Sequence, residues 1–504
     1  MLQVYIPIVL IVLYYVLYYY FTRTFNFWKK KNISGPEPVA LFGNLKEVAF
    51  RQKHIGVVFQ EFYDMFPKEK VVGVYRMTTP CLLIRDLDMI KHIMIKDANL
   101  FTDRGIEFST KGLGQNLFHA DGDTWTALRT NFNPIFTPGK LRNMFHLLNN
   151  CTDIFVNHVE NQSRINPEYE ITTLVKKCTI SAISACAFGI DLDNFYTDQA
   201  EELKTIDRLV LAPNYAIELD FMYPGLLKKL NLSLFPATVK DFFDNLVTSI
   251  TAQRHGKPST RGDFMDIILG LRQSGEIKNL RNKEGTEQTS TTITDDMIAA
   301  QVFIFYMAGY ETSATTMSYL LYELARNPKI QDKVIEEIDN VTKANDGKIT
   351  YESLKDMKYL EKAFLETLRM YSILEPLQRK AKEDYKIPGS DVVIEKDQMI
   401  LIPVRGIHHD EKYYPNPEVF DPERFDPESI ANRHPCAYMP FGLGPRNCIG
   451  MRFGKLQSLL GIAKILRKFR VEASKNTKKD LGIDPNRVIV GPKEVIYLNI
   501  VPRK

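Results

Sequence analysis

The chain has 504 residues, of which 44% are hydrophobic and 25% charged, with a formal net charge of +4. This length can bury a large core, and no linker rich in Gly, Ser or Pro divides the soluble part, which favours one large domain. The mild charge gives no reason to expect nucleic acid as a partner. The six cysteines show no CxxC pair, which is typical of a reducing compartment.

The N-terminus predicts a membrane anchor. Leu2–Phe21 is apolar or aromatic apart from Gln3 and Pro7, about the length that crosses a hydrocarbon core. Basic residues follow this run and none precedes it, so the positive-inside rule places the rest of the chain in the cytosol. The alternative, a cleaved signal peptide, normally has a basic start and a small-residue cleavage site, and both are missing here.

We therefore expect three parts: a transmembrane anchor over residues 1–22, a basic and proline-rich hinge over 23–38, and a catalytic domain over 39–504. The basic residues of the hinge are Arg23, Lys29, Lys30 and Lys31. Its paired prolines resist helix formation and extend the chain.

Within the domain, apolar runs at Lys70–Met77 and Cys81–Arg85 predict two strands, and a helix is expected from Leu87. Most of 140–270 has helical periodicity. Leu211–Pro236 interrupts it with prolines, apolar clusters and two adjacent lysines. We interpret that segment as a patch at the membrane interface, against the alternative of an ordinary helix–helix connection. The polar residues 272–293 predict an exposed loop.

Thr294 predicts the cap of a long helix that runs to Arg326–Asn327, where Pro328 stops it. At the usual rise per residue this helix is about 50 Å long, enough to cross a domain. Further helices are expected at about 329–345 and 353–371. Short β-like segments, Val392–Glu395 and Met399–Pro403, follow. The fold class is therefore mainly α with a small β part, an α+β protein.

The most informative segment is Phe441–Gly450, which places Cys448 just before a helical repeat of apolar residues. Glycines in this loop allow tight turning and close backbone approach. Arg446 can donate to a carboxylate of a ligand. Amide groups after Cys448 would face its sulfur, and the start of a helix favours negative charge there. The pattern indicates a thiolate that contacts a flat, anionic, metal-bearing ligand.

A second group lies inside the long helix, at Ala308–Ser313. Gly309 in mid-helix costs about 1 kcal/mol relative to Ala, so it needs a reason. Thr312 can bond back to the carbonyl of residue 308. A small groove beside a metal would hold dioxygen and a water, and Thr312 with Glu311 could pass protons inward. The alternative is a helix crossing that uses small residues.

These segments resemble the cytochromes P450, the haem-thiolate monooxygenases. Phe441–Gly450 fits FxxGxRxCxG, and Ala308–Ser313 fits the oxygen-binding motif of that family. Glu366 and Arg369 resemble its ExxR, and Trp125 and Arg129 its WxxxR. The resemblance spans essentially the whole chain, and it implies the P450 fold in a single large domain.

The resemblance also implies roles for individual residues. Cys448 would be the axial ligand of the iron of haem b, with Phe441 shielding the sulfur. The propionates would be bound by Trp125, Arg129, Arg379 and Arg446. Glu311 and Thr312 would be catalytic. The structural triad would be Glu366, Arg369 and Arg424. Candidates to line the substrate pocket are Gln301, Ile304, Phe305, Ala308, Thr316 and Leu374.

The implied reaction inserts one oxygen atom from O2 into a lipophilic small molecule, at the cytosolic face of the endoplasmic reticulum membrane. Electrons would come from NADPH through a separate reductase, with cytochrome b5 as a second partner, since the chain has no nucleotide fingerprint. Basic docking contacts would be Arg142, Arg452 and Lys455. Short stretches of the sequence are most similar to those of insect microsomal enzymes that metabolise xenobiotics.

Two departures from that group bear on the substrate and the fold. Ser372–Pro376, with Glu375, replaces the usual Pro-Pro after Arg369, in a stretch that lines the pocket in relatives. His408–Glu411 replaces a commoner His-Arg-Asp-Pro and has no functional account from sequence.

The alternative functions are oxidation of an endogenous lipid or hormone, a haem-thiolate isomerase or dehydratase, a haem carrier or sensor, and a structural membrane protein. A zinc site from His434, Cys436 and Cys448 with His408 or His409 is a weaker alternative.

Overall fold

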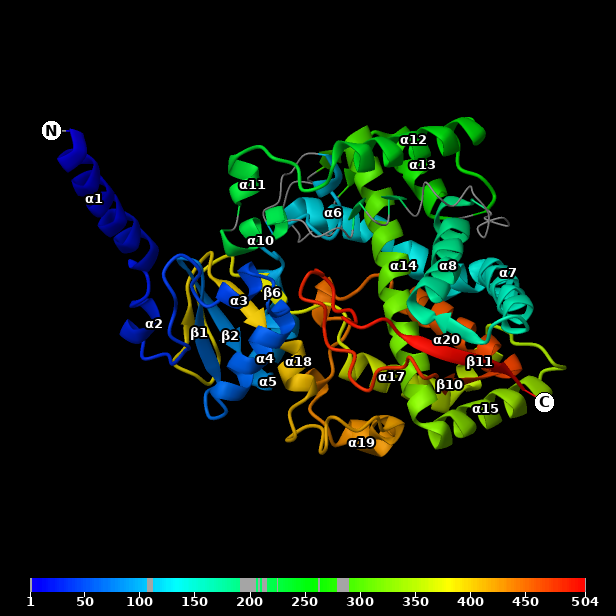
Figure 1. Ribbon diagram of the computed structural model, residues 1–504. Helices are drawn as coiled ribbons and strands as arrows, with labels where there is room; N and C mark the ends of the chain where they lie inside the picture. The colour runs from blue at the N-terminus through cyan, green and yellow to red at the C-terminus, as the bar shows by residue number, and fades with distance from the viewer. Residues whose placement is uncertain are drawn as a thin grey trace.

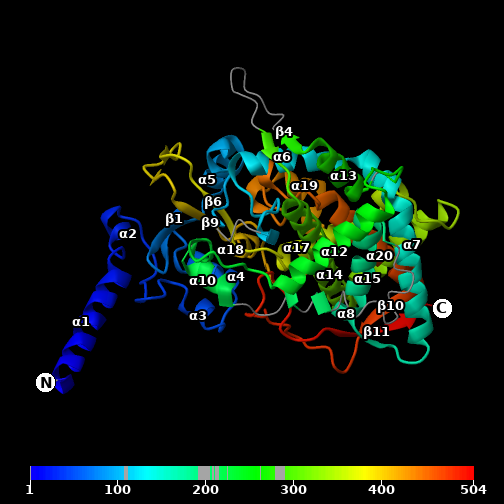
Figure 2. The ribbon, with the colours of Figure 1, turned by 90° about the horizontal axis from the view of Figure 1, so that it is seen from above.

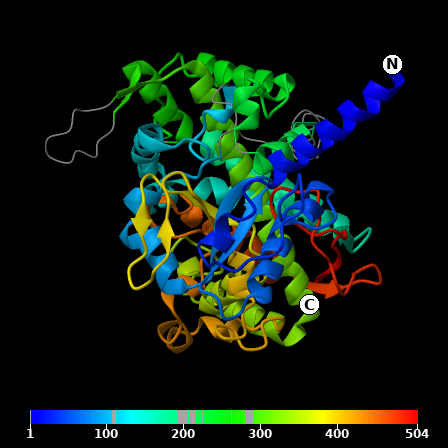
Figure 3. The ribbon, with the colours of Figure 1, turned by 90° about the vertical axis from the view of Figure 1, so that its left-hand side faces the viewer.

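The computed structural model describes residues 2–106, 112–190, 205–206, 209–210, 215–223, 225–261, 263–278 and 290–503. Helices dominate this part of the chain, as expected, and the strands gather in small sheets at its edges (Figure 1). The anchor helix α1 (Leu2–Thr22) extends away from the body in all three views (Figures 1, 2 and 3).

The strands predicted near the start of the domain are confirmed. They are β1 (Val71–Arg76) and β2 (Thr79–Ile84), and α5 (Leu87–Lys91) follows them. The sheet has the order β1-β2-β9-β6; β2 and β9 pair in parallel, the others antiparallel. The strands that complete it are β6 (Leu377–Lys380) and β9 (Met399–Ile402). A second sheet contains β3 (Glu168–Glu170), β10 (Phe469–Ala473) and β11 (Tyr497–Pro502), and β7 (Tyr385–Lys386) pairs with β8 (Val393–Ile394) in a separate hairpin.

Helices build the rest of the domain. Those before the long helix are α2 (Phe27–Lys30), α3 (Lys46–Ala49), α4 (Ile55–Met65), α6 (Gly122–Phe132), α7 (Pro138–Ser163), α8 (Ile171–Ile183), α10 (Tyr215–Met222), α11 (Leu226–Lys229), α12 (Ala237–Gln253) and α13 (Phe264–Ser274). Those after it are α15 (Pro328–Lys343), α16 (Ser353–Asp356), α17 (Lys358–Met370), α18 (Val404–His408), α19 (Pro427–Ala431) and α20 (Met451–Lys468).

The long helix α14 (Asp295–Arg326) runs through the middle of the helical part (Figure 1). Its predicted cap is confirmed, because the Thr294 hydroxyl accepts a hydrogen bond from the Met297 amide at 3.2 Å. The helix ends at Arg326, as expected. Pro328 is then the first residue of α15, where a proline costs no hydrogen bond. The single helix expected over 353–371 is two helices.

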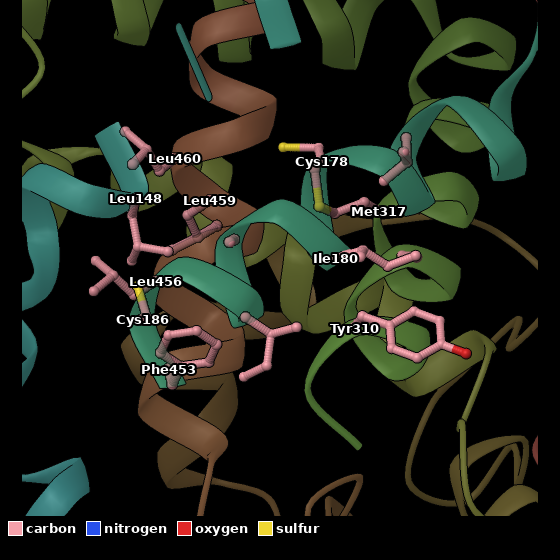
Figure 4. Packing of buried hydrophobic residues seen from close by; sticks show 14 of the residues in the cluster. Leu148, Cys178, Ile180, Cys186, Tyr310, Met317, Phe453, Leu456, Leu459 and Leu460 are labelled. Atoms are coloured by element: carbon pink, nitrogen blue, oxygen red, sulfur yellow. The ribbon is translucent and has the colours of Figure 1, made fainter. Parts of the chain in front are cut away.

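Helix α20, which begins just after Cys448, packs in the main core. Its apolar side chains lie in one buried cluster with residues of α7, α8 and α14, and Figure 4 shows Leu456 and Leu459 close to Leu148. Burying an aliphatic side chain of this size stabilises the fold by about 1.5–3 kcal/mol. The residues after the ligand loop are therefore held by the core.

Of the exposed loop expected over 272–293, the exposure is confirmed for residues 272–276, whereas the loop is wrong for the residues that the structure describes there, since most of them lie in regular structure. Helix α13 continues to Ser274, and β4 (Glu276–Lys278) pairs with β5 (Ser290–Thr292) in an antiparallel hairpin. Ile277 is fully buried in the main core, which fixes this strand to the domain. Residues 279–289, the rest of that expected loop, lie outside the described residues.

The segment expected as a hinge packs against the sheet. The side chain of Trp28 is 2% exposed, and its indole Nε1 donates to the Val74 carbonyl at 3.1 Å. A Cβ on Gly73 would lie 2.3 Å from the Trp28 ring, so glycine makes room for the indole. The Gly73 amide donates to the Ser34 carbonyl at 2.8 Å. The compact body therefore includes residues before position 39.

We predict that Trp28→Ala lowers the stability of the domain by about 3–5 kcal/mol, the usual cost of truncating a buried large aromatic side chain. A chain that lacks residues 1–31 loses Trp28, whereas a chain that lacks residues 1–22 keeps it. The longer deletion should therefore have the lower melting temperature. Equal melting temperatures for the two truncated chains would contradict the packing role of Trp28.

Candidate active site

The loop before Cys448 is shaped by two glycines in left-handed conformations. Gly442 has a φ of +71° and Gly444 a φ of +69°. A Cβ on Gly444 would lie 1.7 Å from the carbonyl oxygen of Met94, so only glycine fits there. The Cys448 amide donates to the Phe441 carbonyl at 2.8 Å, which closes the loop. Cys448 thus stands at a fixed place just ahead of α20.

The side chain of Cys448 has a large accessible surface, although protein atoms surround it within the fold. Burial raises the pKa of its thiol, opposed by the Gly450 amide and by the charges of Arg129 and Arg104. Ala308 of α14 is also exposed, although most of its neighbours on that helix are buried. Accessible surface on residues this deep in the fold indicates that both border an internal space.

Helix α14 and helix α20 are joined at this place. Gln457 of α20 donates from Nε2 to the Gly309 carbonyl at 2.7 Å and to the Ser313 hydroxyl at 2.6 Å. The predicted back-bond of Thr312 is confirmed, since its hydroxyl donates to the Ala308 carbonyl at 2.7 Å. The structure thus brings the hydroxyl-bearing segment of α14 beside the helix that begins just after Cys448.

Gly309 has a packing reason as well. A Cβ there would lie 2.6 Å from Cδ1 of Ile183, so glycine lets α8 approach α14 closely. The sequence alternative of a helix crossing that uses small residues is therefore correct for Gly309 itself. It does not account for the exposed Ala308 on the same helix.

Three arginines converge beside the ligand loop: Arg104, Arg379 and Arg446. Burial and the charge of Arg446 lower the pKa of Arg379 to about 9. Burial, with the charges of Arg446 and Arg379, lowers the pKa of Arg104 well below its usual range. Asp121 pairs with Arg446 at 2.7 Å.

Arg446 has further partners and one open position. It donates to the carbonyls of Thr102 and Ala120, and its guanidinium lies 4.8 Å from the centroid of the Trp125 ring. Its Nε is buried with no hydrogen-bond partner among the described residues. Sequence reasoning missed Arg104, because it belongs to no motif and no spacing relates it to position 446.

This cluster fits the two carboxylates of a haem. Buried cations need opposite charge close by. Among the described residues, Asp121 forms an ion pair with Arg446, and the charge of Asp103 also acts on Arg446. Two further anions would relieve the remaining desolvation and mutual repulsion. An exposed sulfur borders the same region. Arg104, Arg379 and Arg446 would hold the propionates, with Trp125 beneath Arg446, and Cys448 would hold the iron.

Arg129 and Phe441 lie on the loop side. Arg129 donates to the Asn447 carbonyl and to the Asn447 side-chain oxygen, each at 2.8 Å. It therefore fixes the residue before Cys448, a contact that the expected propionate role did not include. Phe441 is partly buried and packs against the main core.

The expected triad is in place. Arg369 donates to both oxygens of Glu366, from Nε at 2.7 Å and from Nη2 at 2.9 Å, and both side chains are fully buried. The Nε of Arg424 lies 3.3 Å from Glu366. Burial raises the pKa of Glu366, opposed by Arg369. A bidentate pair with no exposed surface suits a structural role.

His408, which had no account from sequence, connects this triad to the ligand loop. Its Nδ1 lies 2.8 Å from the Ser372 hydroxyl, and its Nε2 accepts from the Met439 amide at 3.0 Å. Burial lowers the pKa of His408 to about 3, so the ring is neutral. The described residues contain no group of three or more metal-ligating side chains, which leaves the zinc alternative without a site.

The expected pocket residues divide into two groups. Ala308 is exposed, and Ile304 and Leu374 are partly buried. Gln301 uses its amide for structure: it accepts from the Leu117 amide at 2.9 Å and donates to the carbonyls of Gln115 and Met297. Phe305 stacks on Phe264 with ring centroids 4.2 Å apart. Thr316 is buried and donates to the Thr312 carbonyl.

The side chains of Glu311 and Thr312 point in different directions from α14. Successive residues of a helix point about 100° apart, and Glu311 is 1% exposed. Its carboxylate pairs with Lys176 of α8 at 2.9 Å and with Arg487 of the C-terminal loop. Neither partner could be inferred from the sequence, because both are far from position 311 in the chain.

Glu375 points toward α4. It is 5% exposed, and a Cβ on Gly56 would lie 2.7 Å from its Oε2. Its Oε1 has no hydrogen-bond partner among the described residues. Burial raises the pKa of Glu375 to about 8, opposed by the charge and backbone of Arg405.

We predict that Glu375→Gln stabilises the protein at pH 7 and has little effect at pH 4.5. The native state keeps this carboxyl protonated up to about pH 8, whereas the unfolded chain releases the proton near pH 4.5. Stability is therefore lost as the pH rises between these values, by about 1.4 kcal/mol for each unit.

Melting temperatures of both proteins across pH 5 to 8 test this, with exposed Glu352→Gln as the control. A difference between Glu375→Gln and the original protein that does not grow with pH would contradict it.

Comparison with known proteins agrees with this geometry. The family model described as "Cytochrome P450" matches residues 33–499. Cytochrome P450 6B2 of Helicoverpa armigera is 62% identical over 500 residues, 99% of each chain. Cytochrome P450 6B1 of Papilio polyxenes is 52% identical over 97% of each chain, and cytochrome P450 6a2 of Drosophila melanogaster is 38% identical over 96% of each. The chain therefore belongs to the cytochrome P450 family and is a monooxygenase of that family.

Proposed function

We propose that this protein inserts one oxygen atom of O2 into a lipophilic small molecule at the endoplasmic reticulum membrane, with electrons from NADPH delivered by a separate reductase. The observation that carries the proposal is Cys448, an accessible sulfur inside the fold beside a buried group of arginines and a hydroxyl-bearing helix. Haem supplies the activation of dioxygen when it is bound.

The residues of this chain bind the haem, neutralise its charge and supply a proton. Cys448 would hold the iron of that haem through its sulfur. Arg104, Arg379 and Arg446 neutralise the propionates. Thr312 keeps its hydroxyl on the accessible face of α14 by bonding back to residue 308, where it can hold a water and hand on a proton. Glu311, the other residue expected to pass protons, lies in ion pairs with Lys176 and Arg487 on a different face of α14, so the geometry favours Thr312 for this role.

The anchor helix supports membrane attachment. Residues Tyr5–Thr22 form an 18-residue stretch with mean hydropathy 1.7, none of it buried. A second stretch of comparable length, Ile171–Phe188, is 78% buried and belongs to the core. A transmembrane helix needs about 20 apolar residues, which α1 provides.

A second surface, on the segment with α10 and α11, also supports contact of the domain with the membrane. Lys229, Tyr20 and Arg23 lower the pKa of Tyr223, so the segment with α10 and α11 lies near the C-terminal end of α1. Leu230 and Leu232 are exposed there, next to the exposed Lys228 and Lys229. Exposed leucines beside lysines suit a bilayer surface. Pro213 and Pro224, on which the interpretation of this segment also drew, lie outside the described residues.

The reductase would dock on the side of Cys448. Arg452 is exposed at the start of α20, next to the ligand loop. Arg142 and Lys455 are engaged in ion pairs, with Glu352 at 2.5 Å and with Glu361 respectively. Arg452 is therefore the readiest basic contact of the three. Cytochrome b5 would use the same side.

A xenobiotic such as a plant allelochemical or an insecticide is the proposed substrate class. The accessible and partly buried candidates Ala308, Ile304 and Leu374 are apolar, which suits a lipophilic molecule. Glu375 points away toward α4, so it adds no charge that would select a cationic substrate.

Reconstitution with a reductase tests the function directly. The full-length protein, NADPH, ¹⁸O2 and a panel of lipophilic molecules should yield products heavier by one ¹⁸O atom. Cys448→Ser should abolish both the product and the strongly red-shifted Soret band of the reduced carbon-monoxide complex. Product without NADPH would favour the isomerase or dehydratase alternative, and ligand spectra without product would favour a carrier.

We predict that Thr312→Ala retains haem but diverts electrons to hydrogen peroxide, because the variant loses the hydroxyl that delivers the proton. Peroxide formed per NADPH consumed should rise several-fold, measured with the same reductase and substrate. Thr315→Ala, one helical turn from residue 312 and buried, is the matched control. Unchanged peroxide yield in Thr312→Ala would contradict the proton role.

A further inference from the structure

Two tyrosine rings stack face to face inside the fold. Tyr319 lies on α14, and Tyr371 is the residue at which α17 ends. Their ring centroids are 3.9 Å apart, and the planes of the two rings differ by only 6°. Tyr319 is 1% exposed, whereas Tyr371 is partly buried. The two rings are in direct contact, and we call them the tyrosine pair.

Helix α14 connects the tyrosine pair to the candidate active site. Tyr319 lies seven residues after Thr312, and seven residues turn an α-helix through about 700°, so the two side chains share a face. Along the axis the same seven residues span about 10 Å. Thr312 and Ala308 border the internal space in which the haem would lie. The tyrosine pair is therefore about two helical turns from that space.

Tyr371 has a proton acceptor in place. Its hydroxyl donates to Oε1 of Glu323 at 2.6 Å, and Glu323 is 3% exposed. Nδ2 of Asn327 donates to the other carboxylate oxygen at 3.2 Å, and Arg326 lies 3.8 Å from Oε1. These partners donate hydrogen bonds or carry positive charge, which favours the ionised carboxylate. Burial raises the pKa of Glu323 despite these partners, so its carboxylate accepts a proton more readily than one in water.

Tyr319 has no such acceptor. Its hydroxyl is buried with no hydrogen-bond partner among the described residues, and burial raises its pKa. A phenol that loses an electron becomes a strong acid, so the loss is favourable only where a base takes the proton. A radical would therefore settle on Tyr371. The Tyr319 ring supplies the contact through which an electron passes.

We propose that the tyrosine pair returns electrons to the oxidised haem when no substrate consumes its oxidising power, with Glu323 as the proton acceptor. The inference rests on the proposed function, because it requires a haem that has reacted with an oxidant. One electron leaves Tyr371 through the Tyr319 ring and reduces the haem. The O–H bond of Tyr371 breaks as its proton moves to Glu323, and Tyr371 becomes a neutral radical.

A small soluble thiol restores Tyr371, whose side chain is partly exposed. The thiol gives a hydrogen atom to the phenoxyl oxygen and becomes a thiyl radical, and two thiyl radicals combine into a disulfide. Glu323 releases its proton to water on the side of Arg326, whose side chain is 40% exposed. In sum, the haem gains one electron, one thiol is oxidised and one proton is released. Unused oxidation thus ends on a replaceable thiol, and the haem and the pocket are spared.

The test uses the purified full-length holoprotein and peracetic acid, without reductase or substrate. Peracetic acid oxidises the haem by two electrons and leaves as acetate. Samples frozen within milliseconds should show a tyrosyl radical by electron paramagnetic resonance, with lines that narrow when the protein contains ring-deuterated tyrosine. Tyr371→Phe should lower this signal several-fold because it removes the O–H bond. Glu323→Gln should do the same because it removes the proton acceptor.

Tyr322→Phe is the matched control. Tyr322 is also 1% exposed on α14, but its hydroxyl donates to the backbone carbonyls of Lys478 and Lys479, each at 2.9 Å. A carbonyl does not take up a phenolic proton, so this variant should keep the full radical signal. In the original protein, a nitroso spin trap followed by peptide mass spectrometry should locate the radical at residue 371.

Survival of the haem is a second readout. The amount of peracetic acid that bleaches half of the Soret absorbance should fall several-fold in Tyr371→Phe and in Glu323→Gln, and it should stay unchanged in Tyr322→Phe. If Tyr371→Phe fails to bind haem, Glu323→Gln and Tyr319→Phe carry the test, since Tyr319→Phe keeps a stacked ring that is harder to oxidise.

The inference would be overturned by the lack of a tyrosyl radical in the original protein, or by a radical located outside the tyrosine pair. Radical signal and bleaching that match the original protein in both Tyr371→Phe and Glu323→Gln would also overturn it. A protein that forms the radical with peracetic acid but no product with NADPH and reductase would overturn the proposed function alone.

Discussion

A buried pair of opposite charges, Arg369 with Glu366, supports the ligand loop. Arg369 also donates to the His408 carbonyl at 2.9 Å, and the His408 ring accepts from the Met439 amide. Met439 in turn accepts from the Gly442 amide at 3.0 Å, and Phe441 accepts from the Cys448 amide. A continuous set of contacts therefore runs from the centre of the fold to the sulfur. Loss of either Arg369 or Glu366 would leave the other as an uncompensated buried charge, at a cost of about 3–5 kcal/mol.

The second constraint is electrostatic. The fold brings Arg104, Arg379 and Arg446 together and gives Arg446 one carboxylate partner, Asp121. Such a group is unfavourable without anions, and it becomes favourable when two carboxylates bind. Haem binding and folding of this region are then linked, because the ligand stabilises the state that holds it. The loop fixes the sulfur, and the arginines fix the other edge of the same ligand.

Much of this could be predicted where the decisive contacts are local. The Thr294 cap, the Thr312 back-bond and the Glu366–Arg369 pair each join residues three or four positions apart, and all three are present. Contacts between distant segments could not be predicted. Trp28 was assigned to a hinge because its partner strand lies more than forty residues away, and Arg104, Lys176 and Arg487 belong to no motif. Gln301 and Phe305 share a helix with the pocket residues, but their partners are structural.

The central claim is that the sulfur of residue 448 bonds to haem iron. Iron K-edge X-ray absorption of the purified holoprotein measures the atoms bound to the metal most directly. The account predicts one sulfur neighbour at bonding distance beside the porphyrin nitrogens. A spectrum that fits nitrogen and oxygen neighbours alone, or a purified protein that contains no iron porphyrin, would contradict it.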